Sequence, residues 1–381
     1  MRAGVRTFDE ALRQELFSLS HAIHSDPEIA YQEHRAAERI CAFLEAHGHA
    51  VERGYGGLPT AFRAHAGPGG PAVALLAEYD ALPGVGHGCG HDLIAMTNVG
   101  AFVMAAGAAE LAVGVELIGT PAEEHGGGKI DLLRAGAFDH LVAAVSSHPS
   151  AQAEWVVSGT GLGVIGKKVT FHGLASHAGS SPELGRNALN AVIRLFTGID
   201  AWRQHLPSDA RVHGVITEGG LVRNVVPARA QAVFGIRAKD PAFLQEMIAT
   251  FGRIAEGAAL QTGTTVDVET DMPLYDPVTA DRRIGDLLAA ELVRHGVEPA
   301  RGTLVTASTD LGNVSQRVPT DWIRFPVSET PIAGHSDAMR EACLSELAER
   351  NAVTALLALA GAAAELARSG GLAEPGATVP A

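Results

Sequence analysis

The segment from Gly84 to Ala95, GVGHGCGHDLIA, places two histidines and a cysteine within five residues between glycines. Thiolate and imidazole groups are preferred zinc ligands, and a cysteine beside a histidine is also a candidate nucleophile. A glycine-rich turn without chemistry is a third interpretation. This segment alone fits all three, so the choice depends on where the other reactive side chains lie.

Four apolar runs typical of strands are each followed by side chains that bind metals. The run ending near Tyr79 precedes Cys89 and His91, VGVELIG precedes Glu123 and Glu124, LVAAVSS precedes His148, and WIRFPV precedes His335. Open α/β sheets place their active sites beyond the carboxyl ends of their strands. We therefore expect these four loops to bring their side chains together at one edge of a sheet.

The residue types in these loops indicate a metal site. Cys89 and His91 are two residues apart, so on an extended segment both side chains point the same way and can reach one site. One thiolate, several imidazoles and a carboxylate suit zinc, and manganese, cobalt and nickel also accept such a set. Two neighbouring ions would position and ionise a bridging water. One glutamate of the pair Glu123 and Glu124 would bind metal and the other would accept a proton, as in metal-assisted amide hydrolysis.

Two other classes of protein compete with this hypothesis. In a cysteine hydrolase Cys89 would be the nucleophile and His91 its base. Residues two apart rarely reach that geometry, and the glutamates and His148 would then have no role. A non-catalytic protein that binds a metal or metabolite would be expected to lack the base, yet Glu123 is present.

Two glycine-rich matches do not indicate nucleotide binding. GLGVIG, Gly161–Gly166, matches the dinucleotide-binding pattern, but KKVTFHG follows it and reads as a strand where that pattern requires a helix. GGGK, which ends at Lys129, lacks the leading glycine and the serine or threonine of a P-loop.

The composition predicts a soluble, cytoplasmic protein of two domains. The chain has 381 residues, which exceeds one ordinary domain. Its formal net charge of −14 argues against nucleic acid or an anionic membrane as a partner. Three widely spaced cysteines are typical of a reducing compartment, and the N-terminus lacks the apolar core of a signal peptide. The apolar stretch Leu93–Leu111, interrupted by Thr97 and Asn98, reads as a buried helix and not as a membrane span.

Residues 1–163 and 277–381 are predicted to form one α/β domain. Strands that alternate with helices indicate a mainly parallel sheet with helices on both faces. TAFRAHAG and PAVALLAEY read as two strands that meet at a turn. Helices are expected at Thr7–His24 and Gln32–His47, from Asp92, from Lys129, and as one long helix over Ser336–Ala367. The last dozen residues read as a disordered tail.

Residues 164–276 have a different pattern and are predicted to be an inserted α+β domain, a lid. VIGKKVTFHG, RVHGVITEGG and RAQAVFGIRA read as extended, alternating strands. Helices are expected near Asn187–His205 and Pro241–Gln261. We therefore expect a four-stranded antiparallel sheet with two helices.

Seven segments appear in an order that resembles one enzyme family: AEYDALPGVGHGCGHDLIA, GTPAEEHGGGKIDLLRAGAF, SSHPS, FHGLASHAG, RNVVPARAQAVFGIR, ASTDLGNVS and AGHSDA. The set resembles the two-domain, co-catalytic metallopeptidase family that includes aminoacylase and carboxypeptidase G. Within it, the chain is similar to the amidohydrolase branch of the auxin-conjugate (indole-acetyl-amino acid) hydrolases. It is also similar to the p-aminobenzoyl-glutamate and β-alanyl-dipeptide hydrolases.

The resemblance implies two divalent metal ions bound by Cys89, His91, Glu124, His148 and His335. It implies Glu123 as the general base, Asp80 as a residue that orients a ligand, and His177 as a donor to the developing oxyanion. Asn224 and Arg237 would bind the carboxylate of an N-acyl or N-aroyl amino acid or a dipeptide. The resemblance also implies a homodimer through the lid, in which the lid histidine serves the neighbouring subunit.

Three departures from the family pattern lie near these motifs. Gly88 stands where many relatives have alanine, and His125 separates the glutamate pair from the glycine run. GSSPELG, Gly179–Gly185, differs from the bulkier segment of the dipeptidase members. We expect these differences to affect the surroundings of the metal and the acyl pocket.

Overall fold

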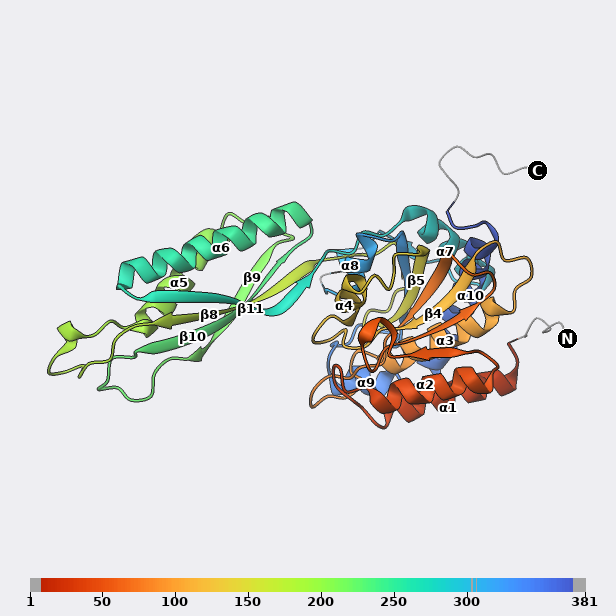
Figure 1. The fold of residues 1–381 in the computed structure, drawn as a ribbon, viewed down its shortest axis with the longest axis horizontal. Coiled ribbons are helices and arrows are strands. Elements are labelled where there is room, and N and C mark those ends of the chain that lie inside the picture. Colours follow the sequence, from red (N-terminus) through yellow and green to blue (C-terminus); the bar gives the residue numbers. More distant parts are fainter. Residues whose placement is uncertain (1–7, 303, 306, 373–381) are drawn as a thin grey trace. The chain divides into compact units, whose positions relative to one another are not determined.

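The computed structural model describes residues 8–302, 304–305 and 307–372. They divide into two compact units, shown in Figure 1. Gly161–Pro277 and a short return segment ending at Thr309 form the second unit, and the chain on either side forms the first unit. The predicted tail lies almost entirely outside the described residues.

The first unit is built on an eight-stranded sheet with the order β1-β2-β4-β3-β5-β14-β6-β12. The strands are β1 Val51–Arg53, β2 Phe62–Ala66, β3 Ala72–Ala77, β4 Gly114–Gly119, β5 Leu141–Ser150, β6 Val156–Val157, β12 Ala300–Arg301 and β14 Thr320–Pro326. The four neighbours β4, β3, β5 and β14 run parallel to one another, while β1, β2 and β6 pair antiparallel with a neighbour. The predicted mainly parallel sheet is confirmed.

Helices cover both faces of this sheet, as expected, because the central strands are apolar on both sides. The helices are α1 Glu10–His24, α2 His34–Ala46, α3 His91–Ala106, α4 Gly128–Arg134, α7 Arg282–Arg294, α8 Leu311–Ser315, α9 Asp337–Ala342 and α10 Glu346–Arg368, with the 3-10 turn η1 Tyr55–Gly57. In β3, Leu75 contributes to the core with α3 and α10, while Leu76 contributes to the core with α4 and α8.

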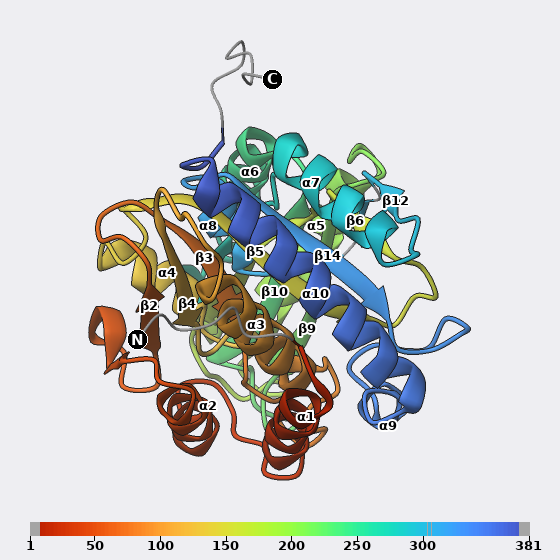
Figure 2. The same cartoon turned by 90° about the vertical axis from the view of Figure 1, so that its right-hand side faces the viewer.

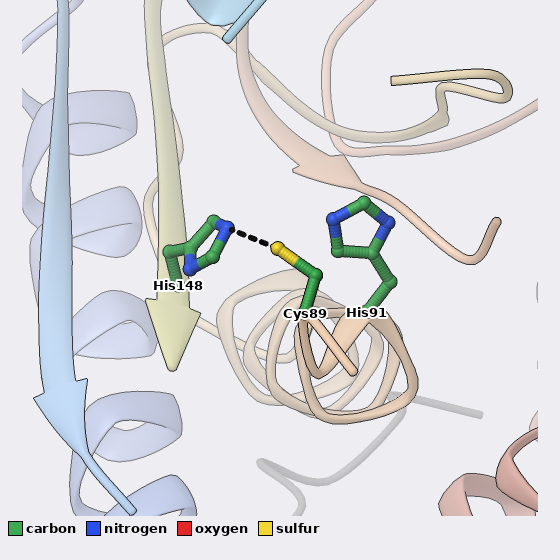
Figure 3. A group of neighbouring side chains, drawn as sticks. All are labelled: Cys89, His91 and His148. Atoms are coloured by element: carbon green, nitrogen blue, oxygen red, sulfur yellow. Dashed lines mark hydrogen bonds between the residues drawn. The ribbon is translucent and has the colours of Figure 1, made fainter. Parts of the chain in front are cut away.

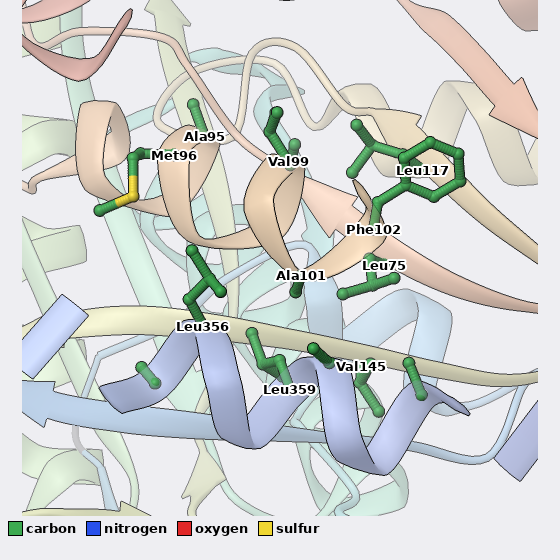
Figure 4. Close-up of a cluster of buried hydrophobic side chains, with 14 of the residues drawn as sticks. Leu75, Ala95, Met96, Val99, Ala101, Phe102, Leu117, Val145, Leu356 and Leu359 are labelled. Carbon is green, nitrogen blue, oxygen red and sulfur yellow. The ribbon is translucent and has the colours of Figure 1, made fainter. Parts of the chain in front are cut away.

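The core on the α3 side joins two long helices to the sheet. Figure 2 shows α3 and α10 lying across the sheet, and Figure 4 shows Ala101 of α3 facing Leu359 of α10, with Phe102 of α3 close to Leu75 of β3. All four side chains are buried. The helix expected from Asp92 is therefore a core helix, and no helix among the described residues is long and apolar enough to cross a membrane.

The two strands expected at TAFRAHAG and PAVALLAEY are β2 and β3, although they do not pair with each other because β4 lies between them. One local expectation for the first unit was wrong. The single helix expected over Ser336–Ala367 is two helices, α9 and α10. Ser345 interrupts it by acting as the N-cap of α10, where its hydroxyl accepts a hydrogen bond from the backbone N–H of Ala348 at 3.1 Å.

The second unit contains a four-stranded antiparallel sheet with the order β11-β8-β10-β9 and two helices, as predicted. Its elements are β8 Gly163–His172, η2 Pro182–Leu184, α5 Ala188–Arg203, β9 Arg211–Glu218, β10 Arg229–Ala238, α6 Pro241–Thr262 and β11 Thr265–Tyr275. The short pair β7 Thr160–Gly161 and β13 Leu304–Val305 forms a separate small sheet. The helices α5 and α6 share one core with one face of the four-stranded sheet. Most of GLGVIG lies in β8 and no helix follows it directly, in agreement with the sequence.

Candidate metal centre

The loops that hold most of the predicted site residues follow the neighbouring parallel strands of the first unit. Asp80, Cys89 and His91 come after β3, Glu123 and Glu124 after β4, and His335 after β14, whereas His148 lies inside β5 near its end. Parallel strands share one carboxyl edge, so these residues meet there.

His91 is held by a carboxylate that comes from the same loop. Its Nδ1–H donates to Asp80 Oδ1 at 2.9 Å, and Asp80 Oδ2 accepts from the backbone N–H of Glu124 at 2.9 Å. Burial opposes ionisation of Asp80, but His91 and these hydrogen bonds hold the pKa of its carboxyl below the usual range. With the proton on Nδ1, the lone pair of His91 Nε2 is available for a metal.

Cys89 and His91 share one site, as expected, but the backbone conformation that places them there differs from the predicted one. The segment is not extended, because Gly90 has a φ of 81° and α3 begins at His91. That left-handed conformation suits glycine, and a Cβ there would lie 2.5 Å from Pro149 Cγ. The turn still directs the thiol and the imidazole to one site.

His148 presents its other nitrogen to Cys89. The carbonyl oxygen of Pro149 accepts a hydrogen bond from His148 Nδ1–H at 2.6 Å, so Nε2 carries the lone pair. This Nε2 lies 3.6 Å from Cys89 Sγ, and Figure 3 shows the sulfur between the two imidazole rings. Burial lowers the pKa of His148 to about 4, so its imidazole is neutral near pH 7.

Glu124 and His335 complete the group on the other side. Glu124 Oε1 lies 3.7 Å from His91 Nε2 and 3.6 Å from His335 Nε2. The backbone N–H of His335 donates to the carbonyl oxygen of Gly88 at 3.1 Å, which ties its loop to the loop of Cys89. The side chain of His335 is 58% exposed, whereas that of Glu124 is 8% exposed. The site is therefore open on the side of His335.

The donor atoms fit a metal. Cys89, His91 and His148 form one group, and Cys89, Glu124 and His335 form another, with the candidate ligand atoms of each group within 4.8 Å of one another. In the described part of the chain, His91 Nε2 and Glu124 Oε1 are buried without a hydrogen-bond partner. Such atoms are costly unless something satisfies them. Ligands bound at about 2.0–2.3 Å to one ion lie at separations like those seen here.

Glu123 is buried between these groups and a further carboxylate. Its Oε2 lies 3.8 Å from His91 Nε2. Burial raises the pKa of Glu123 well above its usual range, and the negative charges of Glu78 and Glu124 raise it further. A carboxyl group with a raised pKa beside a metal site has the basicity that proton transfer requires.

Sequence reasoning missed three charged residues next to this centre. Lys129 is fully buried, and its Nζ lies 2.7 Å from Glu78 Oε1 and 2.6 Å from Asp310 Oδ1. Glu78 Oε2 lies 3.6 Å from His91 Nε2, and Glu78, His91 and Glu123 form a third group of potential ligands. Glu78 directly follows the apolar run of β3, which was a signal that its charge is buried.

The predicted lid residues lie in the second unit, where His177 and Asn224 are neighbours. The backbone N–H of Ala178 donates to the carbonyl oxygen of Asn224 at 2.9 Å. His177 Nδ1 accepts from the backbone N–H groups of Gly179 and Ser180 at 3.2 and 3.1 Å. The neutral ring therefore carries its proton on Nε2, which is a hydrogen-bond donor on an exposed side chain.

Arg237 lies at the opposite end of the same sheet. Asn224 precedes the start of β10, while Arg237 is its penultimate residue. Eight residues of strand separate Arg229 from Arg237, which corresponds to about 26 Å. Arg237 donates to Ser308 Oγ at 2.9 Å and to His213 Nε2 at 3.4 Å. One chain therefore does not bring Asn224 and Arg237 to the same substrate carboxylate.

Solved structures share the fold of nearly the whole chain. A protein from methicillin-resistant Staphylococcus aureus superimposes with a TM-score of 0.78 at 19% identity, covering 94% of this chain and 97% of that one. A dinuclear metal-binding peptidase of the M20 family from Bacillus subtilis superimposes with a TM-score of 0.75 at 20% identity, covering 94% and 99%. At these identities the likeness concerns the fold.

Sequence comparison defines the family. Mouse Xaa-Arg dipeptidase is 36% identical over 378 residues, which is 94% of this chain and 87% of the relative. One of the polypeptides of p-aminobenzoyl-glutamate hydrolase from Escherichia coli (strain K12) is 38% identical over 291 residues, 69% of this chain and 59% of the relative. A peptidase dimerisation domain matches residues 162–262. The chain belongs to the M20 family of metal-dependent peptidases and amidohydrolases.

Family membership confirms the predicted class of enzyme, a metal-dependent hydrolase of amide bonds. It favours that class over the cysteine hydrolase and the non-catalytic binding protein. The prediction that the chain uses divalent metal is supported by the family and by the donor atoms that converge in the first unit.

The ligand set predicts the effect of removing single donors. We expect Cys89→Ala and His148→Ala to lose most of their bound metal in elemental analysis while remaining folded by circular dichroism. Each change removes one donor from a group of three whose other atoms lie within 4.8 Å. His205→Ala is the matched control, because His205 is exposed after α5 in the second unit and belongs to none of these groups. Full metal occupancy in both ligand variants would contradict the assignment.

Proposed function

We propose that the protein hydrolyses the amide bond of a small N-acyl or N-aroyl amino acid or a dipeptide. Cys89, His91, Glu124, His148 and His335 would hold two divalent ions, zinc or manganese. When bound, such ions polarise a carbonyl oxygen and lower the pKa of water. The observation that carries the proposal is the convergence of the unpartnered His91 Nε2 and Glu124 Oε1 beside the buried carboxyl of Glu123.

Glu123 is assigned the proton transfers. Its carboxylate accepts the proton of the attacking water and then donates it to the nitrogen that leaves as an amine. Glu124 has its backbone N–H bound to Asp80, so the adjacent Glu123 side chain is held at a defined place in the turn. Lys129 pairs with Glu78 on the other side and limits the repulsion that this second carboxylate would exert.

Arg237 is assigned to the carboxylate of the substrate. Among the described residues no carboxylate pairs with its guanidinium group, and burial lowers its pKa from the usual range. The mouse relative is named for a dipeptide and the bacterial relative for p-aminobenzoyl-glutamate. In both names the amide nitrogen belongs to an amino acid with a free carboxylate. A charged donor for that carboxylate is the shared requirement.

The second unit is assigned to dimer formation. The dimerisation-domain match covers residues 162–262, and β9 is an edge strand with Val215 58% and Ile216 41% exposed. Exposed apolar edge strands pair readily with another chain. A second copy would also explain why His177 and Arg237 lie at opposite ends of one sheet, because each copy would then supply His177 to its neighbour's reaction. His177 Nε2–H would donate to the oxyanion.

The cysteines favour a reducing compartment such as the cytoplasm. Cys41, Cys89 and Cys343 are all free thiols in the structure. Cys89 must remain reduced to bind metal as a thiolate. The proposed location therefore follows from the proposed ligand.

The role of Glu123 is tested with the metal-loaded protein and a panel of N-acyl amino acids, N-aroyl amino acids and dipeptides. Glu123→Gln is expected to keep its metal and lower kcat by about 10²–10⁴, since general-base loss has that cost. Glu154→Gln, on the exposed surface, is the control. Near-normal turnover in Glu123→Gln would assign the proton transfer to another group.

The role of Arg237 is tested by comparing a substrate acid with its methyl ester. Arg237→Ala should reduce kcat/KM for the acid by about one to two powers of ten, since a charge-assisted bond of this kind contributes roughly 1.5–3 kcal/mol. The ester should be affected little. Equal losses on acid and ester would show that Arg237 supports the fold of the second unit and does not bind the carboxylate.

The assignment of His177 to the neighbouring subunit predicts complementation. His177→Ala and Glu123→Gln should each be nearly inactive alone, but a mixture refolded or co-expressed together should recover activity. About half of randomly mixed dimers pair one chain of each kind, and each has one intact site, so about a quarter of normal activity is expected. No recovery in mixed dimers isolated with two different affinity tags would place His177 in its own subunit's reaction.

A further inference from the structure

The turn that carries Glu123 and Glu124 begins with a residue in an unfavourable conformation. Ala122, three residues beyond the end of β4, has a φ of 59°, which places its backbone in the left-handed region. The carbonyl oxygen of Ala122 accepts a hydrogen bond from the backbone N–H of Gly127 at 2.8 Å and so closes the turn. A residue in this conformation persists only where its surroundings hold it.

Glu33, from a distant part of the sequence, fixes the conformation of Ala122. It precedes α2, is fully buried, and its Oε1 accepts a hydrogen bond from the backbone N–H of Ala122 at 2.9 Å. The same Oε1 accepts from the backbone N–H of Tyr31 at 2.9 Å, and Oε2 accepts from the hydroxyl of Thr60 at 3.2 Å. One carboxyl oxygen therefore binds two segments of chain that meet at the start of the turn.

Tyr31 holds the far end of the same turn. It also has a left-handed conformation, with a φ of 60°, and its hydroxyl donates to Asp131 Oδ2 on α4 at 2.7 Å. Its ring covers Gly126, where a Cβ would lie 2.4 Å from Tyr31 Cε2. The segment Tyr31–Glu33 thus contacts the turn at Ala122, at Gly126 and at the helix that follows.

Nothing in the reaction assigned above requires Glu33 to contact a substrate or an ion. Its hydrogen bonds go to the backbone of Tyr31 and Ala122 and to Thr60. The turn could otherwise relax at Ala122, and a rotation there would move the next two side chains, Glu123 and Glu124, together. Small displacements of reacting groups have large effects on rate, on the order of 10²-fold for about 1 Å.

We infer that Glu33 is a positioning residue, which acts with Tyr31 to hold the turn of Ala122–Gly127 so that Glu123 and Glu124 keep the geometry needed for catalysis. The inference deepens the proposed function and rests on it for its kinetic consequence. Its structural consequence, the rigidity of the turn, does not depend on which reaction is catalysed.

Substitutions can separate the effect of the hydrogen bonds of Glu33 from the effect of its charge. Burial, with the neighbouring charge of Asp80, raises the pKa of Glu33 to about 7, so its neutral form is accessible. A glutamine oxygen can accept the same two backbone N–H bonds. Leucine fills a similar volume and accepts none. Aspartate keeps the charge but draws the acceptor away from Ala122.

The experiment compares these variants in the metal-loaded enzyme. Glu33→Leu is expected to lower kcat by about 10- to 100-fold with KM changed less than about threefold, the result of misplaced reacting groups. Glu33→Gln should retain most of the normal kcat. The kcat of Glu33→Asp should lie between those of Glu33→Leu and Glu33→Gln. Bound metal should stay above half of the normal content, since the ligand side chains are all present.

Glu116→Leu is the matched control. Glu116 of β4 is also a fully buried glutamate of the first unit, and it accepts hydrogen bonds from Arg63 of β2 and from His140, which precedes β5. It should lower Tm as Glu33→Leu does but leave kcat near normal. Hydrogen exchange measured by mass spectrometry should speed up in the peptide containing Ala122–Gly127 for Glu33→Leu and not for Glu116→Leu.

The outcomes separate the inference from the proposed function. If Glu33→Leu lowers Tm but keeps kcat and normal exchange in the turn, Glu33 supports stability alone and the inference is wrong. Equal kcat losses in Glu33→Gln and Glu33→Leu would also overturn it. If Glu33→Leu does not fold, the same measurements of kcat and hydrogen exchange are made on Glu33→Asp and Glu33→Gln, and a lower kcat in Glu33→Asp supports the inference. If the unmodified protein hydrolyses no amide of the panel, the proposed function fails. The exchange data still test whether Glu33 restrains the turn of Ala122–Gly127.

Discussion

The carboxylate of Asp80 is the link on which the arrangement of the centre depends. One of its oxygens accepts from His91 and the other accepts from the backbone of Glu124, so it joins the loop after β3 to the loop after β4. A buried carboxylate is tolerated when both oxygens are hydrogen-bonded. The same bond that satisfies Asp80 keeps the proton of His91 on Nδ1 and leaves Nε2 for the metal. The orientation and tautomer of His91, and its position relative to Glu124, therefore follow from one side chain.

A second buried charge network lies next to this link. Lys129 at the start of α4 pairs with Glu78 after β3 and with Asp310 before α8, so three segments of the first unit meet at one ammonium group. Removing one partner would leave an uncompensated charge in the interior, which costs about 3–5 kcal/mol in proteins. The network also places a fixed positive charge near the carboxylates of the centre. Stability of the fold and electrostatics of the site thus share the same residues.

His177 and Arg237 lie near opposite ends of the sheet of the second unit. A β-strand separates side chains by about 3.3 Å per residue, so ten residues of β10 keep the His177 and Arg237 regions far apart within one copy. The match to a dimerisation domain supports the proposal that a second copy supplies His177, since a symmetric pair can bring opposite ends together.

The sequence by itself determined the element types, the mainly parallel sheet, the inserted antiparallel sheet and the family, because apolar periodicity and short motifs are local properties. It also indicated that Cys89, His91, Glu123, Glu124, His148 and His335 lie at or beyond strand ends, since strand ends can be recognised from the chain. Only the tertiary structure decided that β4 separates β2 from β3 and that Glu33 reaches Ala122 across 89 residues. It alone showed that Lys129 is buried between two carboxylates and that Arg237 lies far from Asn224 within the second unit. These features depend on contacts between distant segments, and neither the spacing of residues nor their local preferences specifies which buried partner a polar group will find.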